Sequence, residues 1–351
     1  MTAIQECEVA FIGVSLADWL PDAGDLGRVI AVFQRSCYVE APDGMLFCVA
    51  GHRLGRGPLT LGVELPSRWT LGGLGVAEGT TLVRQGEDIL LARRLVFCIR
   101  DAKVWQPPKI TEFAIIAEIR SRLSALTARL QPLLPTQGLA PLVPHTAALA
   151  RGNLPEVNHA STVVKLAKQR VSELAGGLLI GNSRRIDRAV QGLLGLGPGL
   201  TPSGDDLLGG LMVALIVALV RNTVNGEGRP RPSGRADWGS IVAILAESVS
   251  MHSASKTNRI SAALLEQSAR GIGSEYQHRL LQCLLEQRGH RDSVTAALNL
   301  TRAGHSSGWD TLTGLLLGVR LASRLMGGAS INMLTPPNVR VLAGETSGAR
   351  A

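Results

Sequence analysis

Short apolar and alternating stretches in the N-terminal third of the chain predict β-strands. Between Gly27 and Trp105 these stretches cover residues 29–33, 37–39, 45–49, 59–65 and 90–99. Asp43 and Gly44 stand between the second and third stretch, where this pair favours a hairpin turn. We therefore expect a small β-barrel or β-sandwich. A Pro-Pro pair at 107–108 follows and predicts a boundary, because proline interrupts both helices and strands.

Beyond the prolines, apolar residues recur with the period of an α-helix. The predicted helices cover residues 111–130, 161–174, 184–194, 206–220, 240–251, 259–270, 275–287, 294–302 and 309–325. Gly, Pro and Asn concentrate in 222–237 and predict a flexible surface loop. We expect an α+β protein with a β-rich N-terminal domain (1–108), a mainly helical domain (109–328) and a loose tail (329–351).

The composition is that of a folded globular protein. The chain has 351 residues, of which 45% are hydrophobic and 18% are charged. The longest apolar run, 207–220, is too short to cross a bilayer and predicts a buried helix. The first ten residues carry acidic groups and no basic segment, which argues against a signal peptide. Five cysteines without C-x-x-C spacing predict neither disulfides nor a zinc site, so we expect a cytoplasmic protein without membrane association.

The net charge of +8 comes almost wholly from arginine. Arginine suits bidentate recognition of carboxylate or phosphate. The basic residues are scattered and form no dense run, which argues against nucleic-acid binding. Small anionic substrates fit this pattern, and so does a simple arginine bias of the coding sequence.

A loop rich in glycine and proline, residues 195–206, precedes the longest apolar helix; we call it the glycine loop. The start of a helix offers unpaired backbone N–H groups and the positive end of its dipole, and both favour an anion. We therefore predict a phosphate- or substrate-binding role for the loop residues Gly197, Gly199, Thr201, Ser203, Gly204 and Asp205.

A sequence pattern that begins at the end of the glycine loop is repeated later in the chain. The pattern S-G-x-D-x-L-x-G-L occurs at 203–211 and again at 307–315, and each copy begins a predicted apolar helix. Each serine is placed to be an N-cap and each aspartate, Asp206 or Asp310, to reach back to it, which is a complete structural explanation. The repeated glycines, Gly210 and Gly314, would let another helix approach closely.

The functional alternative is that both helix starts meet at one site. Asp206 and Asp310 would then form a carboxylate pair with Asp205 as an extra acid, suited to an amide, an ammonium group or a divalent cation such as Mg²⁺. No histidine or further acid stands at ligand spacing. We therefore assign no metal ligands and predict no definite cofactor.

Two further polar segments extend the candidate site. Lys256, Thr257, Asn258 and Arg259 begin a predicted helix, and two cations at its positive end would be disfavoured unless an anion is bound. The alternative is a pair of solvated cations beside a loop. In the second segment, His305 precedes two serines, Ser306 and Ser307, and could donate a proton or only hydrogen-bond the loop.

Three blocks of the sequence carry a resemblance to a known family. GLGPGLTPSGDDLLGG, KTNRISAALL with the following Gly271, and GHSSGWDTLTGLLLG resemble the hallmark blocks of a bacterial family of formerly unknown function. That family includes the H subunit of the oxamate carbamoyltransferase of allantoin catabolism. The resemblance covers roughly residues 181–325. The β-rich region agrees only in general character, and 222–237 resembles an insertion.

The resemblance implies a subunit of a cytoplasmic carbamoyltransferase in allantoin and purine nitrogen catabolism. Its implied partners are an acyl-CoA-synthetase-like subunit and a third subunit in a hetero-oligomer. The implied reaction converts oxalurate and phosphate to oxamate and carbamoyl phosphate. Two alternatives remain open: a non-catalytic assembly subunit, and a regulatory protein that binds a small anion or a nucleotide.

The residues suit this chemistry, although they do not require it. Backbone amides between Thr201 and Gly204, together with Lys256 and Arg259, would hold a phosphate or carboxylate. A carbonyl would be polarised by His305 and by Ser306 or Ser307. As catalytic candidates we select His305, Ser307, Asp206 and Asp310, with the two acids orienting the carbamoyl NH₂ group or only capping their helices.

Overall fold

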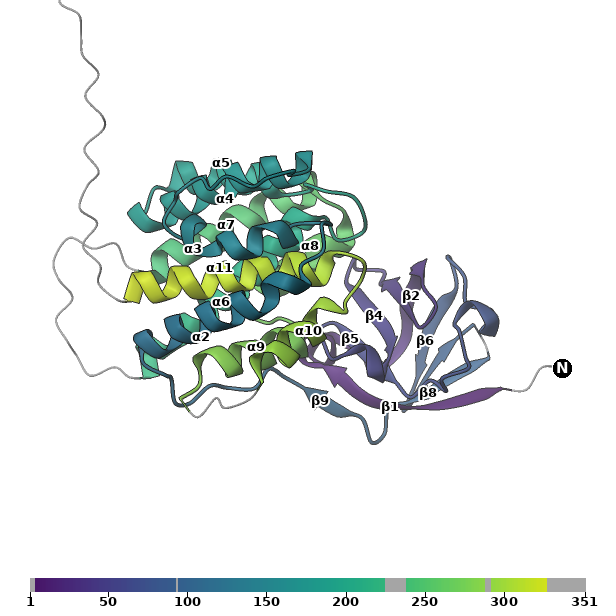
Figure 1. The fold of residues 1–351 in the computed structure, drawn as a ribbon. Helices are drawn as coiled ribbons and strands as arrows, with labels where there is room; N and C mark the ends of the chain where they lie inside the picture. Colours follow the sequence, from purple (N-terminus) through teal and green to yellow (C-terminus); the bar gives the residue numbers. More distant parts are fainter. Residues whose placement is uncertain (1–3, 93, 225–237, 288–291, 327–351) are drawn as a thin grey trace, which may run out of the picture.

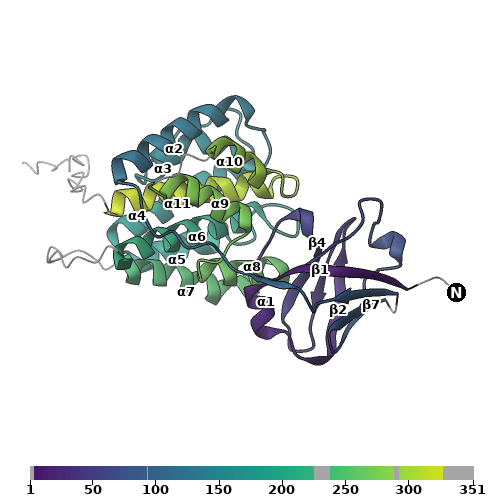
Figure 2. The same cartoon turned by 90° about the horizontal axis from the view of Figure 1, so that it is seen from below.

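The structure is a computed structural model, and it describes residues 4–92, 94–224, 238–287 and 292–326 (Figure 1). Most of the predicted loop 222–237 and all of the predicted tail 329–351 therefore lie outside the described residues. A barrel of strands is followed by a helical region, which confirms the predicted α+β class. Both views place the barrel at one end of the helical region, beside α8 (Figures 1 and 2).

Eight strands close the barrel in the order β1-β5-β4-β3-β2-β6-β7-β8. Strand β8 pairs with the first part of β1, and the short strand β9 pairs with its last part. The sequence prediction of a barrel or a sandwich thus resolves to a barrel. Its side chains alternate as expected for a closed sheet, with the inward-facing residues buried. The strand bounds are β1 Gln5–Gly13, β2 Ala23–Val32, β3 Ser36–Glu40, β4 Leu46–Gly51, β5 Thr60–Val63, β6 Thr81–Gln85, β7 Asp88–Leu91, β8 Leu95–Cys98 and β9 Lys103–Trp105.

The predicted strand at 90–99 is instead a hairpin of β7 and β8. Leu91 pairs directly with Leu95, and the chain reverses between them. Ala92 has a positive φ of 59° there, a conformation that glycine usually supplies. Because the turn contains neither glycine nor proline, the apolar pattern continued across it and predicted one long strand.

Helices α2 and α4 to α11 fall close to their predicted positions, whereas α1 and α3 were not predicted. The helix bounds are α1 Val14–Trp19, α2 Ile116–Leu130, α3 Thr146–Leu149, α4 Thr162–Ile180, α5 Ser183–Leu193, α6 Ser203–Val224, α7 Trp238–Lys256, α8 Arg259–Ala269, α9 Glu275–Leu285, α10 Ser293–Thr301 and α11 Ser307–Met326. The helix predicted from Thr111 begins only at Ile116. The preceding residues are extended, because Phe113 forms a β-bridge with Glu286 after the end of α9.

Helices α6 and α11 lie side by side in the middle of the helical region (Figure 1). Their approach depends on the two motif glycines. A Cβ atom on Gly210 would lie 2.2 Å from the Thr311 carbonyl oxygen, and one on Gly314 would lie 2.0 Å from the Leu207 carbonyl oxygen. The predicted close approach is confirmed, and the two glycines make equivalent contacts on opposite helices.

Hydrogen bonds and an ion pair join the barrel to the helical region. Ser15 Oγ donates to Gln267 Oε1 at 2.6 Å, and the Glu275 N–H donates to the Arg56 carbonyl at 2.8 Å. Arg259 forms an ion pair with Glu40 of β3. These contacts fix the barrel against both ends of α8 and the start of α9.

One buried histidine gives the helical region a predictable response to acid. His278 in α9 is 3% exposed, its Nε2 accepts the Gly273 N–H at 3.0 Å, and burial lowers its pKa to about 4. The unfolded chain protonates it near 6.5, so stability should fall as the pH drops from about 6.5 to 4, by roughly 3 kcal/mol. Thermal denaturation of the wild type and His278→Gln at pH 7.5 and 4 should show a smaller acid loss in the variant. Equal acid losses in both proteins would contradict this assignment.

Candidate functional site

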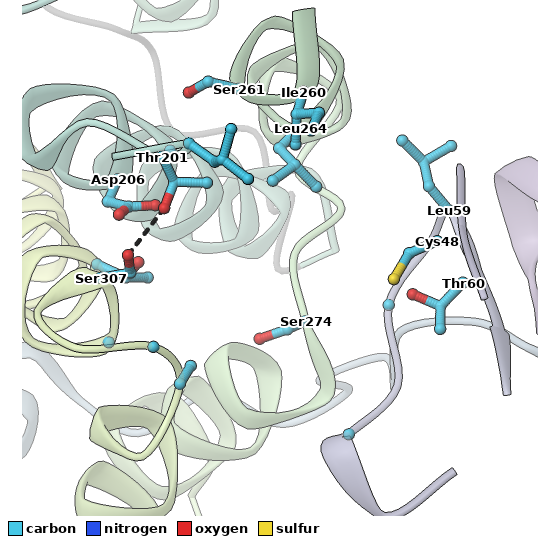
Figure 3. Close-up of a pocket in the computed structure, with 18 of the residues that line it drawn as sticks. Cys48, Leu59, Thr60, Thr201, Asp206, Ile260, Ser261, Leu264, Ser274 and Ser307 are labelled. Atoms are coloured by element: carbon cyan, nitrogen blue, oxygen red, sulfur yellow. Dashed lines mark hydrogen bonds between the residues drawn. The ribbon is translucent and has the colours of Figure 1, made fainter. Parts of the chain in front are cut away.

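A cavity of about 1120 Å³ lies between the barrel and the helical region. Its barrel wall comes from β3, β4 and the residues before β5. Its helical wall comes from the glycine loop, from the starts of α6, α9 and α11, and from α8 along its length. Figure 3 shows both walls. Helix starts that face a cavity favour a ligand with negative or carbonyl oxygen atoms.

Three polar side chains gather on the helical wall, and we call them the polar cluster: Thr201, Asp206 and Ser307 (Figure 3). The hydroxyl oxygens of Thr201 and Ser307 lie 2.8 Å apart in a hydrogen bond. Both hydroxyls also hydrogen-bond the Asp206 carboxyl group. Asp206 is half-buried, and its Oδ2 atom is inaccessible to solvent and has no hydrogen-bond partner among the described residues. A buried carboxyl oxygen without a partner in a cavity wall marks a place where a ligand could bind.

The second motif acid lies behind this cluster. Asp310 is fully buried, and its Oδ1 accepts the Leu139 N–H at 2.5 Å. Ser203 and Ser306 also hydrogen-bond its carboxyl group, whereas its Oδ2 has no hydrogen-bond partner in the part of the chain that the structure describes. The bonds between the motifs are reciprocal, because Ser203 bonds Asp310 and Ser307 bonds Asp206. Asp310 does not line the cavity, so the structure places it as a support of the polar cluster.

Burial raises the pKa of both acids. For Asp206 burial is the largest cause, the nearby Asp310 charge adds to it, and the hydrogen bonds from Ser307 and Thr201 oppose it. For Asp310 burial outweighs the hydrogen bonds from Leu139, Ser203 and Ser306. The pKa of Asp206 lies well above its ordinary value, so this carboxyl group favours the protonated form.

The capping interpretation was wrong by one residue. Ser203 and Ser307 are the first residues of α6 and α11, whereas the preceding carbonyls of Pro202 and Ser306 accept the first N–H groups. The serine side chains are consequently free to bond the acid of the opposite motif. Each aspartate thus bonds the serine of the opposite motif, and we call these hydrogen bonds the crossed bonds. They account for an aspartate at positions 206 and 310 better than a cap within each helix does.

Asp205 has a different environment from its neighbour. It is 2% exposed, and its Oδ1 accepts the Gly195 N–H at 2.8 Å. Its Oδ2 accepts hydrogen bonds from Thr257 and from Ser261, the latter at 2.7 Å. The carboxylate thus ties the glycine loop and the start of α8 to α6.

Removal of the Asp205 carboxylate should destabilise the protein strongly. Asp205→Ala would leave three donors without an acceptor, and we expect a loss of about 3 kcal/mol in the free energy of unfolding. Asp205→Asn keeps one acceptor oxygen and should lose less. Chemical denaturation of both variants tests this, and an unchanged midpoint for Asp205→Ala would contradict the proposed tie.

The segment 256–259 lies beside the cavity and not in its wall. Lys256 ends α7, so the prediction that it lies at the positive end of the next helix was wrong. A cation at a helix C-terminus is favoured by the dipole. Thr257 bonds Asp205, and Asn258 caps α8 through Ser261 and donates to the Leu200 carbonyl at 2.8 Å. Arg259 is exposed and pairs with Glu40. Substrate binding by these four residues stays a prediction.

The remaining candidates divide between the cavity and the packing beneath it. Gly199, His305 and Ser306 line the cavity. In contrast, a Cβ on Gly204 would lie 2.0 Å from the Leu193 carbonyl oxygen, and one on Gly197 would lie 2.9 Å from the Ser203 nitrogen. Those two glycines permit the tight loop, and the structure gives them no place in the cavity wall.

Sequence reasoning missed every residue that the barrel contributes. Tyr38 of β3 lines the cavity, and burial raises the pKa of its hydroxyl, so it stays a neutral donor. Ser274, which caps α9, also lines the cavity (Figure 3). No sequence signal identifies these residues, because their role depends on how the barrel packs against the helices.

Within the described ranges, no group of three or more histidine, cysteine, aspartate or glutamate side chains could hold a metal ion. Among the described helices, none combines the length and apolar character needed to cross a membrane.

The comparison with protein families agrees with the resemblance found in the sequence. Residues 193–319 match the family described as oxamate carbamoyltransferase subunit AllH. The match includes the glycine loop, α8 and both copies of the motif, and it leaves out the barrel. No curated protein and no solved structure matches the chain significantly. The comparisons therefore support a link to a subunit of a carbamoyltransferase.

Proposed function

We propose that this chain is a subunit of an oxamate-carbamoyltransferase-like enzyme and binds the carbamoyl substrate in the cavity between barrel and helices. The observation that carries the proposal is the unpartnered Oδ2 of Asp206, beside the hydroxyls of Thr201 and Ser307, in the region that matches the family. The proposal includes a cytoplasmic enzyme of allantoin and purine nitrogen catabolism. Its partners would be an acyl-CoA-synthetase-like subunit and a third subunit.

The reaction would transfer the carbamoyl group from oxalurate to phosphate. The C–N bond to the oxamate nitrogen breaks, and a bond forms between the carbamoyl carbon and a phosphate oxygen. The leaving nitrogen gains a proton, and hydrogen phosphate loses one. Protonated Asp206 can supply that proton and recover it from phosphate, because burial raises its pKa.

The surrounding groups suit the rest of the substrate. The N–H groups at the starts of α6 and α11 and the hydroxyls of Thr201 and Ser307 can stabilise negative charge that develops on the carbamoyl oxygen. His305 and Ser306 lie in the same wall and are the further candidates for binding phosphate or the oxamate carboxylate. Asp310 would keep Ser203 and Ser306 oriented.

One alternative is a subunit that serves assembly only. Under that alternative the motif glycines and the two acids serve packing, and the chemistry lies on a partner subunit. Gly210 and Gly314 do pack against backbone within the chain, which agrees with this alternative as well as with the proposal. Turnover that is lost in charge-removing variants that still assemble would argue against it, and a regulatory anion site is the third possibility.

Calorimetry with oxamate and carbamoyl phosphate tests the proposal. We expect Ser307→Ala to weaken binding about tenfold, which corresponds to the loss of one hydrogen bond to a charged ligand. Ser124→Ala is a matched control, since Ser124 is exposed on α2 and its hydroxyl donates to the Arg120 carbonyl of the same helix. Equal affinities of the two variants for these ligands would show that the polar cluster is not part of the binding site. Ligand binding without turnover in the assembled enzyme would favour the regulatory alternative.

A further inference from the structure

The cavity is much larger than the proposed reaction requires. Its volume is about 1120 Å³, whereas a small acid such as oxamate fills only on the order of 100 Å³, judged from about 30 Å³ for one water molecule. Cavities of this size usually hold ligands with many more atoms. A small carbamoyl substrate at the polar cluster would leave most of the space empty.

The unused space has apolar walls. On the barrel side these are formed by Leu46 and Leu59, and on the helical side by Ile260 and Leu264 of α8. Figure 3 shows Leu59 across the cavity from Ile260 and Leu264, away from the polar cluster. Cys48 lies in the same barrel wall, and burial raises the pKa of its thiol, which keeps it uncharged. The cavity therefore has one polar end and a long apolar side.

Large apolar side chains are also exposed around this cavity. Leu54 is 52% exposed, Phe33 is 45% exposed and Leu200 is 42% exposed, and all three line it. Leu54 and Phe33 belong to the barrel part and Leu200 to the glycine loop. An apolar group of a ligand that reached them would remove apolar surface from water on both walls.

We propose that the ligand of this cavity is an oxamate or N-carbamoyl compound that carries an apolar aliphatic or aromatic substituent. The carbamoyl or carboxylate head would bind at Thr201, Asp206 and Ser307, and the substituent would lie between β4 and α8. This inference rests on the proposed function for the identity of the head. It goes further in assigning the chain a larger substrate than oxalurate.

A series of N-alkyl oxamates with the same head tests the inference by calorimetry. From oxamate through N-butyl to N-hexyl oxamate, we expect the affinity to rise about two- to fourfold per methylene, since each one leaves water. An affinity that stays flat along the series would overturn the inference. Oxamate binding itself would still stand in that case, so the proposed function would survive.

Two variants test where in the cavity the alkyl chain binds. Leu264→Trp should fill the apolar side and abolish the gain from the alkyl chain, while oxamate affinity changes less than about twofold. If Leu264→Trp does not fold, Leu54→Asp serves instead, because Leu54 is exposed and the new charge would face the alkyl chain. A full chain-length gain in the folded variant would overturn the proposed location.

A variant of the polar cluster separates the two proposals. Ser307→Ala should weaken every member of the series by the same factor, about tenfold. Hexanol, which lacks the head, should bind far more weakly than N-hexyl oxamate. Equal binding of hexanol, or no binding by any member, would overturn both the head assignment and the inference.

Discussion

Gly314→Ala is expected to lower the free energy of unfolding by about 3 kcal/mol or more. The added Cβ would lie 2.0 Å from the Leu207 carbonyl oxygen, a backbone atom that cannot rotate away. Helices α6 and α11 would have to separate, and with them the two helix starts that hold the polar cluster. We expect the melting temperature to drop by roughly 6 °C and oxamate binding to weaken as well.

Gly209→Ala is the matched control for this variant. Gly209 lies in the same helix pair, one residue before Gly210, and a Cβ there would meet the Ser268 side chain, with its Oγ at 3.1 Å and its Cβ at 3.8 Å. That hydroxyl can move, and alanine favours a helix over glycine by about 1 kcal/mol. The control should therefore melt at or above the wild-type temperature. Equal melting temperatures for the two variants would contradict the account of the close helix approach.

Asp206→Asn is expected to reduce turnover in the assembled enzyme about 100-fold, because an amide cannot give up and recover a proton. Its NH₂ group can still donate a hydrogen bond, so oxamate affinity should change less than about threefold. The kcat should thus fall while KM stays nearly constant. A large rise in KM with unchanged kcat would contradict proton transfer by Asp206.

The stability of the Asp206→Asn variant should depend on pH differently from that of the wild type. The folded state raises the pKa of Asp206, so it binds more protons than the unfolded chain between the two pKa values. The stability of the wild type therefore decreases as the pH rises through this interval, and the loss is complete above the folded pKa. Asp206→Asn removes this loss and should melt about 2 °C above the wild type at pH 8, with a smaller difference at pH 4. A variant that melts lower at pH 8 would show that the carboxylate is ionised and stabilising.

The spacing of apolar residues along the chain was sufficient to predict most of the helices. The helices were predictable because their apolar positions repeat over several turns, as in α8 and α11. The barrel was harder, since β1, β6 and β9 lie outside the predicted stretches and the Ala92 turn lacks glycine. A strand is defined by the partner that it pairs with, and that partner is distant in the sequence.

The candidate site was predictable on one wall only. The glycine loop and the repeated motif indicated Thr201, Asp206 and Ser307, which do meet in the cavity. The crossed bonds to Asp310 could not be predicted, because they depend on how two helices separated by about a hundred residues pack. Tyr38 and the apolar barrel residues carry no local signal, and their placement follows from the contact between barrel and helices.

The two walls of the cavity come from separate stretches of the chain. The helical wall lies largely within residues 193–319, which match the family, whereas the barrel wall comes from residues 33–60. Substitutions in β3, β4 or the residues before β5 can therefore reshape one side of the cavity without disturbing the crossed helix starts. If the helical wall carries the chemistry, the barrel becomes an exchangeable selectivity element, and barrels grafted from related chains would retune substrate preference while the reaction stays the same.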